Sequence, residues 1–200
     1  MTYSQEEEAL IAQKPLIKAD SVAQKIEQAT LLKNQGNVYF KHEEYKKAIN
    51  KYKCVSLWIT GLSVPGDSMS QYSQGNTSMS ASASEGEEIQ QLLVTSHTNI
   101  AMARIKLEQY DLAIEACDKA LSLNPTNVKA LVRKAQAYSS RGKYSTAKDI
   151  LRKALEIEPK NGTVRKALQQ VIEQNKLHPE EDQLRQNFAN MFNKSGGIYK

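Results

Sequence analysis

Residues 94–127, VTSHTNIAMARIKLEQYDLAIEACDKALSLNPTN, and residues 128–161, VKALVRKAQAYSSRGKYSTAKDILRKALEIEPKN, are two copies of one pattern. Residues of the first copy recur in the second at a distance of 34: Tyr110 and Tyr144, Ala113 and Ala147, Ala120 and Ala154, Leu121 and Leu155, and Pro125 and Pro159. A period of this length is typical of stacked helix pairs, in which each unit buries its apolar face against its neighbours. Because proline cannot continue a helix, the proline near the end of each copy predicts where the second helix stops. A generic helical bundle with chance alanines would not keep one spacing at several positions.

The two copies resemble tetratricopeptide repeats (TPRs), which are helix-turn-helix units of about 34 residues. An interrupted copy, ATLLKNQGNVYFKHEEYKKAINKYKCV, precedes them from Ala29. Its residues at the family's repeat positions are Gly36, Tyr39, Tyr45, Ala48 and Tyr52. The resemblance implies an all-α fold, a TPR superhelix of three repeats with a long C-terminal helix that caps the stack. Such arrays bind a partner on a concave surface, so we expect a protein-binding module and no enzyme.

Capping and composition signals divide the chain into segments. Asp20 or Ser21 can cap a long first helix that runs to about His42, and a second helix is expected from about Tyr45 to Gly61. The expected segments are a flexible acidic tail at 1–19, a TPR domain at 20–194 and a tail at 195–200. Within the domain they are repeat one at 29–62, a Ser-rich insertion at 63–88, repeat two at 94–127, repeat three at 128–161 and the C-terminal helix at 163–194.

Two of these segments have a composition of their own. The insertion, SVPGDSMSQYSQGNTSMSASASEGEE, is rich in Ser and Gly and almost free of large aliphatic residues, so we expect a disordered or loosely held loop. The C-terminal helix has an early apolar stripe and a later one, and we expect a kink at His178-Pro179. The two stripes are Val164, Leu168, Val171 and Ile172, and Leu184, Phe188, Met191 and Phe192.

Composition narrows the class of protein. The formal net charge of +5 suits an acidic partner but is too small to indicate nucleic acid. No apolar run reaches the roughly 20 residues of a membrane span, and the acidic N-terminus lacks a secretion signal, so we expect the cytosol, with the nucleus as the alternative. Cys54 and Cys117 make no disulfide framework, and Cys117 is expected as a small buried residue. With the scattered histidines they form no metal spacing, and no phosphate loop or other cofactor motif is present.

The expected binding residues lie on the first helix of each repeat and are Lys33, Asn37, Asn99, Lys129 and Arg133. Lys33 and Asn37 share a helix face, as do Lys129 and Arg133, because each pair is four residues apart. The set resembles the dicarboxylate clamp of co-chaperone TPR domains. This resemblance implies binding of the Hsp90 or Hsp70 C-terminal tail, which ends in Glu-Glu-Val-Asp.

The chemistry of the five side chains suits that ligand. Lysine and arginine give charge-assisted hydrogen bonds to carboxylates, and asparagine can donate to an oxygen and accept from a peptide N–H. We expect both Lys129 and Arg133 to face solvent, while Lys134 points elsewhere because adjacent helical residues do not share a face. Lysines that only solvate a helix surface are the alternative explanation of this pattern.

The stretches around residues 31–53 and 96–121 and the late QNFANMF resemble the TPR region of large FK506-binding immunophilins and the tetratricopeptide-repeat-protein-nine family. The residues before Ser21 are too few for an isomerase domain, so we expect no isomerase activity; the sequence could also be a piece of a longer immunophilin. Two other functions stay open. One is a TPR scaffold that binds a different protein segment, and the other is RNA binding, for which interleaved aromatic residues are lacking.

Overall fold

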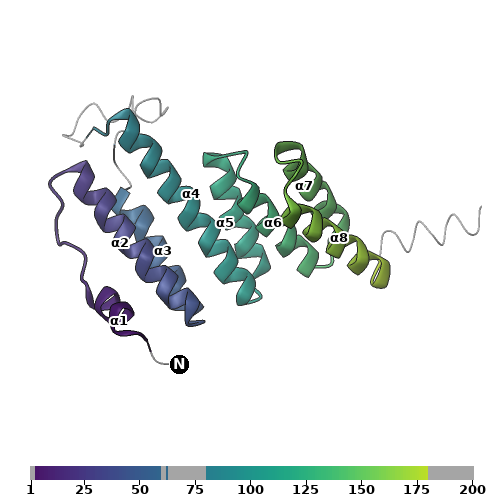
Figure 1. The fold of residues 1–200 in the computed structure, drawn as a ribbon, viewed down its shortest axis with the longest axis horizontal. Coiled ribbons are helices and arrows are strands. Elements are labelled where there is room, and N and C mark those ends of the chain that lie inside the picture. The colour runs from purple at the N-terminus through teal and green to yellow at the C-terminus, as the bar shows by residue number, and fades with distance from the viewer. Residues whose placement is uncertain (1–2, 60–61, 63–79, 180–200) are drawn as a thin grey trace, which may run out of the picture.

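A computed structural model describes residues 3–59, 62 and 80–179 of the chain (Figure 1). Over these residues every regular element is a helix. The helices are α1 (Gln5–Ala12), α2 (Val22–Lys41), α3 (Tyr45–Ile59), α4 (Ala83–Lys106), α5 (Tyr110–Leu123), α6 (Val128–Ser140), α7 (Tyr144–Ile157) and α8 (Gly162–Leu177). No described helix is both long enough and apolar enough to cross a bilayer.

The helices from α2 to α7 form three consecutive pairs, and α8 lies at the end of the row (Figure 1). Helices α2, α4, α6 and α8 contact one another in turn, so they make one layer of the stack. Helices α3, α5 and α7 make the other layer, each packed against the helix before it and the helix after it. The predicted all-α superhelix of three helix pairs with a terminal helix is confirmed.

The repeated small residues lie where helices meet. Ala113, Ala120, Ala147 and Ala154 are completely buried, which lets neighbouring backbones come close together. In the first pair Gly36 has this role, since a Cβ built on it would stand 2.6 Å from Cε1 of the Tyr52 ring. The ring of Tyr52 therefore fills the space that this glycine leaves open.

Several predicted helix ends agree with the structure. Ser21 caps α2, and its hydroxyl accepts a hydrogen bond from the Gln24 N–H at 3.2 Å. Helix α3 begins at Tyr45 as expected, and α5 and α7 end two residues before Pro125 and Pro159. The caps and prolines that mark these ends are local signals, which explains why the sequence alone located them.

The predicted flexible tail at 1–19 is wrong for residues 5–12, which form α1. Ser4 and Glu7 make a capping box at its start, and the Gln35 side chain of α2 donates to the carbonyls of Leu10 and Gln13 at 2.8 and 2.7 Å. Gln35 is completely buried between the two helices. The partners of α1 lie on α2, more than twenty residues away in the sequence, so no short-range sequence pattern predicts these contacts.

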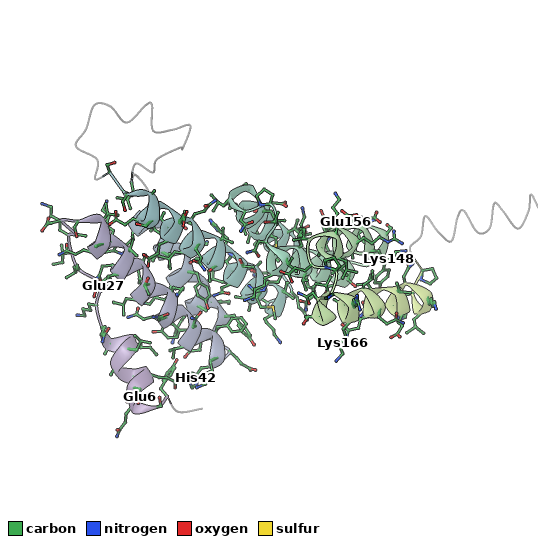
Figure 2. The ribbon with its side chains drawn as sticks, turned by 45° about the horizontal axis from the view of Figure 1, so that its top comes forward. Glu6, Glu27, His42, Lys148, Glu156 and Lys166 are labelled. Atoms are coloured by element: carbon green, nitrogen blue, oxygen red, sulfur yellow. The ribbon has the colours of Figure 1, made fainter. Side chains whose placement is uncertain are left out.

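A carboxylate near the start of α1 also contacts the C-terminal end of α2. Glu7 of α1 pairs with Lys41 at 2.7 Å and with His42 at 2.9 Å. Figure 2 shows His42 at the end of α2 beside α1, while the neighbouring Glu6 points away. The Lys41 ammonium, the backbone amide of Ser4 and the His42 ring hold the pKa of Glu7 at about 2, below its ordinary 4.5.

The predicted loop at 63–88 is wrong for residues 83–88, which belong to α4. Ser82 and Glu85 form a capping box, and Ile89 and Leu92 are buried against the apolar side chains of α2 and α3. The first helix of repeat two therefore begins well before Val94. The earlier part of the insertion, residues 63–79, lies outside the described residues.

The last helix, α8, buries Val164 and Val171 against α6 and α7. It ends at Leu177 with His178 as its C-cap, so the chain leaves the helical conformation at the predicted site of the kink, His178-Pro179. The reason is that the residue before a proline is disfavoured in the helical conformation. The predicted continuation to residue 194 lies outside the described residues from residue 180 onward.

The predicted burial of Cys117 is confirmed, because its side chain is completely buried between the first two helix pairs. Burial raises the pKa of this thiol to about 12. Cys117 is thus a packing residue, since the thiol and not the thiolate is present at neutral pH.

Candidate ligand-binding groove

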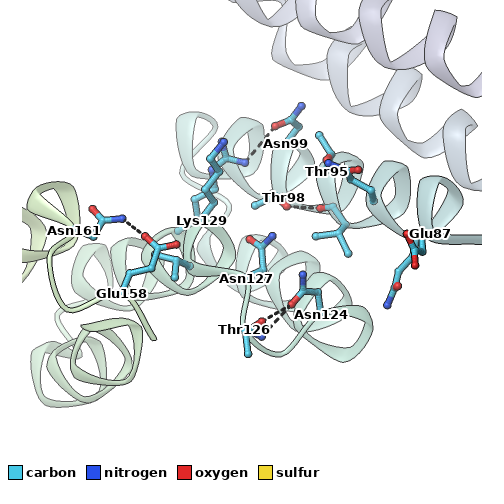
Figure 3. Close-up of a pocket in the computed structure, with 15 residues that line it drawn as sticks. Glu87, Thr95, Thr98, Asn99, Asn124, Thr126, Asn127, Lys129, Glu158 and Asn161 are labelled. Carbon is cyan, nitrogen blue, oxygen red and sulfur yellow. Dashed lines mark hydrogen bonds between the residues drawn. The ribbon is translucent and has the colours of Figure 1, made fainter. Parts of the chain in front are cut away.

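A groove of about 570 Å³ lies between α4 and α6 (Figure 3). Its walls are the inner face of α4, the start of α6 and the turns at 124–127 and 158–161. Three of the five predicted binding residues, Asn99, Lys129 and Arg133, line this groove.

The inner helices of all three repeats are joined by a row of hydrogen bonds at one end of the groove. Asn99 of α4 donates to Oδ1 of Asn37 on α2 at 3.3 Å, and Arg133 of α6 donates to Oδ1 of Asn99 at 3.3 Å. Tyr52 of α3 also donates to Oδ1 of Asn37, at 2.9 Å. Arginine has five N–H donors, so Arg133 keeps donors for a ligand.

Lys129 is exposed and lies one turn before Arg133 on α6. Lys33 is half-buried and lies one turn before Asn37 on α2; it does not line this groove, and no hydrogen bond joins it to the other four residues. Within the described part of the chain, no carboxylate forms an ion pair with Lys33, Lys129 or Arg133. By contrast, Lys134 pairs with Asp118 at 2.5 Å, so the prediction that it points elsewhere is confirmed.

Arg133 is half-buried, so only part of its side chain faces solvent as predicted. Burial lowers the pKa of its guanidinium, although arginine stays protonated in proteins. Burial also raises the pKa of the Tyr52 phenol to about 12, so Tyr52 remains a neutral hydrogen-bond donor. A partly desolvated cation attracts an anion more strongly than a fully solvated one, because the local dielectric constant is lower.

The groove also contains two carboxylates that are not among the predicted binding residues, Glu87 and Glu158. Asn161 donates to Oε2 of Glu158 at 2.6 Å, whereas Glu87 has no partner among the described residues. The signal for Glu87 is its spacing, since Glu87, Gln91, Thr95 and Asn99 are each four residues apart on α4. Glu87 lies in the stretch that the sequence predicts to be a loop, and helical spacing has no meaning in a loop.

The donor set of the groove is suited to carboxylates and amides. Over the described ranges, no three His, Cys, Asp or Glu side chains come together in a way that could hold a metal ion. The row of asparagine amides and unpaired cations can bind an anion with several oxygen atoms.

Comparisons with known proteins agree with this architecture. Residues 104–180 match the family model described as tetratricopeptide repeat. The peptidyl-prolyl cis-trans isomerase FKBP4 of Bos taurus is 32% identical over 172 residues, which cover 86% of this chain and 34% of that protein. The chain thus spans about a third of the length of the curated relatives that it matches.

Two solved structures share the fold. The first TPR of Spaghetti (RPAP3), bound to the HSP90 peptide SRMEEVD, aligns with a TM-score of 0.54 at 24% identity and covers 72% of this chain and 93% of its own. The second TPR domain of human RPAP3, in complex with the HSP70 peptide SGPTIEEVD, has a TM-score of 0.54 at 23% identity over 74% of this chain and 97% of its own.

Proposed function

This chain carries a tetratricopeptide repeat domain that is homologous to part of FKBP4, and from this we propose that its groove binds the acidic C-terminal tail of Hsp90 or Hsp70. The protein then acts as a co-chaperone or adaptor, in the cytosol or the nucleus, and its own contribution is binding without catalysis. In this proposal Lys33, Asn37, Asn99, Lys129 and Arg133 form the carboxylate clamp.

The observation that carries the proposal is the hydrogen-bonded row of Asn37, Asn99 and Arg133, with Lys129 one turn away in the same groove. A C-terminal aspartate presents two carboxylates close together. The amides and the arginine provide charge-assisted hydrogen bonds to them, worth roughly 1.5–3 kcal/mol each. Since no described carboxylate of the chain neutralises these cations, they are available to a ligand.

A titration with paired peptides tests the proposal. SRMEEVD with a free C-terminal carboxylate should bind, and the same peptide with an amidated C-terminus should lose most of its affinity, because one of the two gripped carboxylates is absent. Equal binding of the acid and the amide would mean that the groove accepts an internal segment, as a scaffold of a different class would. No binding of either peptide would reject chaperone-tail recognition altogether.

A further inference from the structure

Helix α4 runs along the groove, and the spacing of its groove-lining residues gives the length of the groove. Glu87, Gln91, Thr95 and Asn99 lie on one face of this helix, and all four line the groove. Twelve residues separate Glu87 from Asn99, which corresponds to about 18 Å along a helix that rises 1.5 Å per residue. The inner face of α4 therefore forms a wall about 18 Å long between these two residues.

The two ends of this wall have opposite chemistry. Asn99 marks the cationic end, because Arg133 donates to its amide and Lys129 lies close by in the groove. Glu87 marks the other end with an exposed carboxylate that no described residue pairs with. The second groove carboxylate, Glu158, is already engaged by Asn161.

An extended peptide with a C-terminal aspartate matches this spacing. In SRMEEVD the arginine precedes the terminal aspartate by five residues, and five residues of extended chain span about 17–18 Å. A terminal carboxylate at Asn99 and Arg133 would therefore bring the arginine to Glu87. In SGPTIEEVD the residue at the corresponding position is threonine, which has no charge to pair.

We propose that Glu87 is a specificity residue that selects a basic side chain five positions before the C-terminal aspartate of the bound peptide. This inference rests on the proposed function, because it uses the clamp to set the register. It predicts that the groove discriminates between acidic tails by an arginine or lysine at that position, in favour of a tail of the SRMEEVD type.

The test uses peptides that differ at one residue. The full chain is titrated with SRMEEVD and with SAMEEVD, and the titrations are repeated for Glu87→Gln and for the control Glu88→Gln, whose exposed side chain lies next along α4 but outside the groove lining. Exposed ion pairs are weak, so the arginine should improve the affinity of the parent chain by about two- to fivefold. Glu87→Gln should remove this advantage and leave the affinity for SAMEEVD unchanged, while Glu88→Gln should keep it.

A charge reversal gives the sharper result. The parent chain should bind SRMEEVD more tightly than SEMEEVD, and the Glu87→Lys variant should reverse this order. Circular dichroism should show the same helix content in all variants, because Glu87 is exposed. An arginine advantage that persists in Glu87→Gln, or that moves to a Glu158→Gln variant, would overturn the assignment.

The failure of this inference can be told apart from that of the proposed function. Suppose that free-acid SRMEEVD binds, its amide does not, and SAMEEVD binds as tightly as SRMEEVD. The carboxylate clamp would then be supported and the role of Glu87 rejected. If neither free-acid peptide binds the parent chain, both the proposed function and the role of Glu87 are rejected.

Discussion

Asn99 is the middle residue of the hydrogen-bonded row, because its side-chain amide makes two hydrogen bonds in opposite roles. It donates to Asn37 and accepts from Arg133, each at 3.3 Å. Both contacts are long for N–H···O bonds, so they orient the side chains at little energetic cost to an incoming ligand. A carboxylate that replaces them would gain charge-assisted bonds from the same groups.

Arg133→Ala and Lys129→Ala should each weaken SRMEEVD binding by roughly 1.5–3 kcal/mol, about tenfold or more. The reason is that each removes a cation that no described carboxylate neutralises. The control is Arg152→Ala on α7, since Arg152 is exposed and pairs only with the exposed Asp149. Calorimetric titration measures the effect. An unchanged affinity in both groove variants would contradict the clamp assignment.

Gly36→Ala should destabilise the protein, because the new methyl group would stand 2.6 Å from the buried Tyr52 ring. Overpacking of this kind costs about 1–3 kcal/mol, which exceeds the gain of up to about 1 kcal/mol from replacing a helical glycine. Gly162→Ala is the matched control, since nothing lies within 4 Å of the added atom. Thermal unfolding should give a lower Tm for the first variant only. Equal Tm values would mean that Tyr52 moves aside freely.

Helix α4 shows how one element serves two purposes. Its first turns bury Ile89 and Leu92 in the core of the first helix pair, and its inner face forms the wall of the groove. The capping box of Ser82 and Glu85 sets where the helix starts, and thereby how far the wall extends beyond Asn99.

Helix α1 covers the outer side of α2 through polar contacts, with Gln35 and Glu7 as the main anchors. Gln35 of α2 and the C-cap residue His42 are seven residues apart, on the face opposite to Lys33 and Asn37. Helix α1 therefore closes the first end of the stack without entering the groove.

Glu7→Gln should loosen α1, because it removes the charge that pairs with Lys41 and His42. Amide hydrogen exchange should then be faster over residues 5–12, whereas Glu8→Gln, at an exposed position without a described partner, should leave it unchanged. The same contact should weaken with acid. The pKa of Glu7 is depressed in the folded state, so its stabilising effect is present above its ordinary value of 4.5 and is lost as the pH falls toward about 2. Protection of residues 5–12 that is equal in both variants would show that Glu7 does not hold the helix.

The stack of helix pairs as a whole presents one layer of helices to the groove and the other layer to the opposite side. Side chains of repeats two and three line the groove, and Asn37 of repeat one joins them through its hydrogen bond with Asn99. Only the superhelical arrangement brings these residues to one surface. The molecule as a whole has a formal net charge of +5, which favours the binding of an acidic ligand.

The affinity for SRMEEVD should fall as the ionic strength rises, because the Debye length shortens from about 10 Å at 0.1 M to about 3 Å at 1 M. Titrations over this range measure the slope, and the amidated peptide, with one charge fewer, should show a smaller slope. An affinity that does not change with salt would indicate that apolar contacts dominate binding.

Local sequence is enough to predict the helix pairs, since the recurrence of Ala113 at Ala147 and of Pro125 at Pro159 reports packing and helix ends that repeat along the chain. It also places Asn37, Asn99 and Arg133 on inner helices, because each lies on the first helix of its repeat. The contacts between these residues needed the tertiary structure, as they join positions 62 and 34 residues apart. The same holds for α1, which depends on a buried glutamine 22 to 25 residues further along, and for Glu87, which enters the groove only because α4 begins at Ala83. Short-range sequence patterns do not predict contacts between residues this far apart. These contacts form only when the helices pack against one another in the tertiary structure.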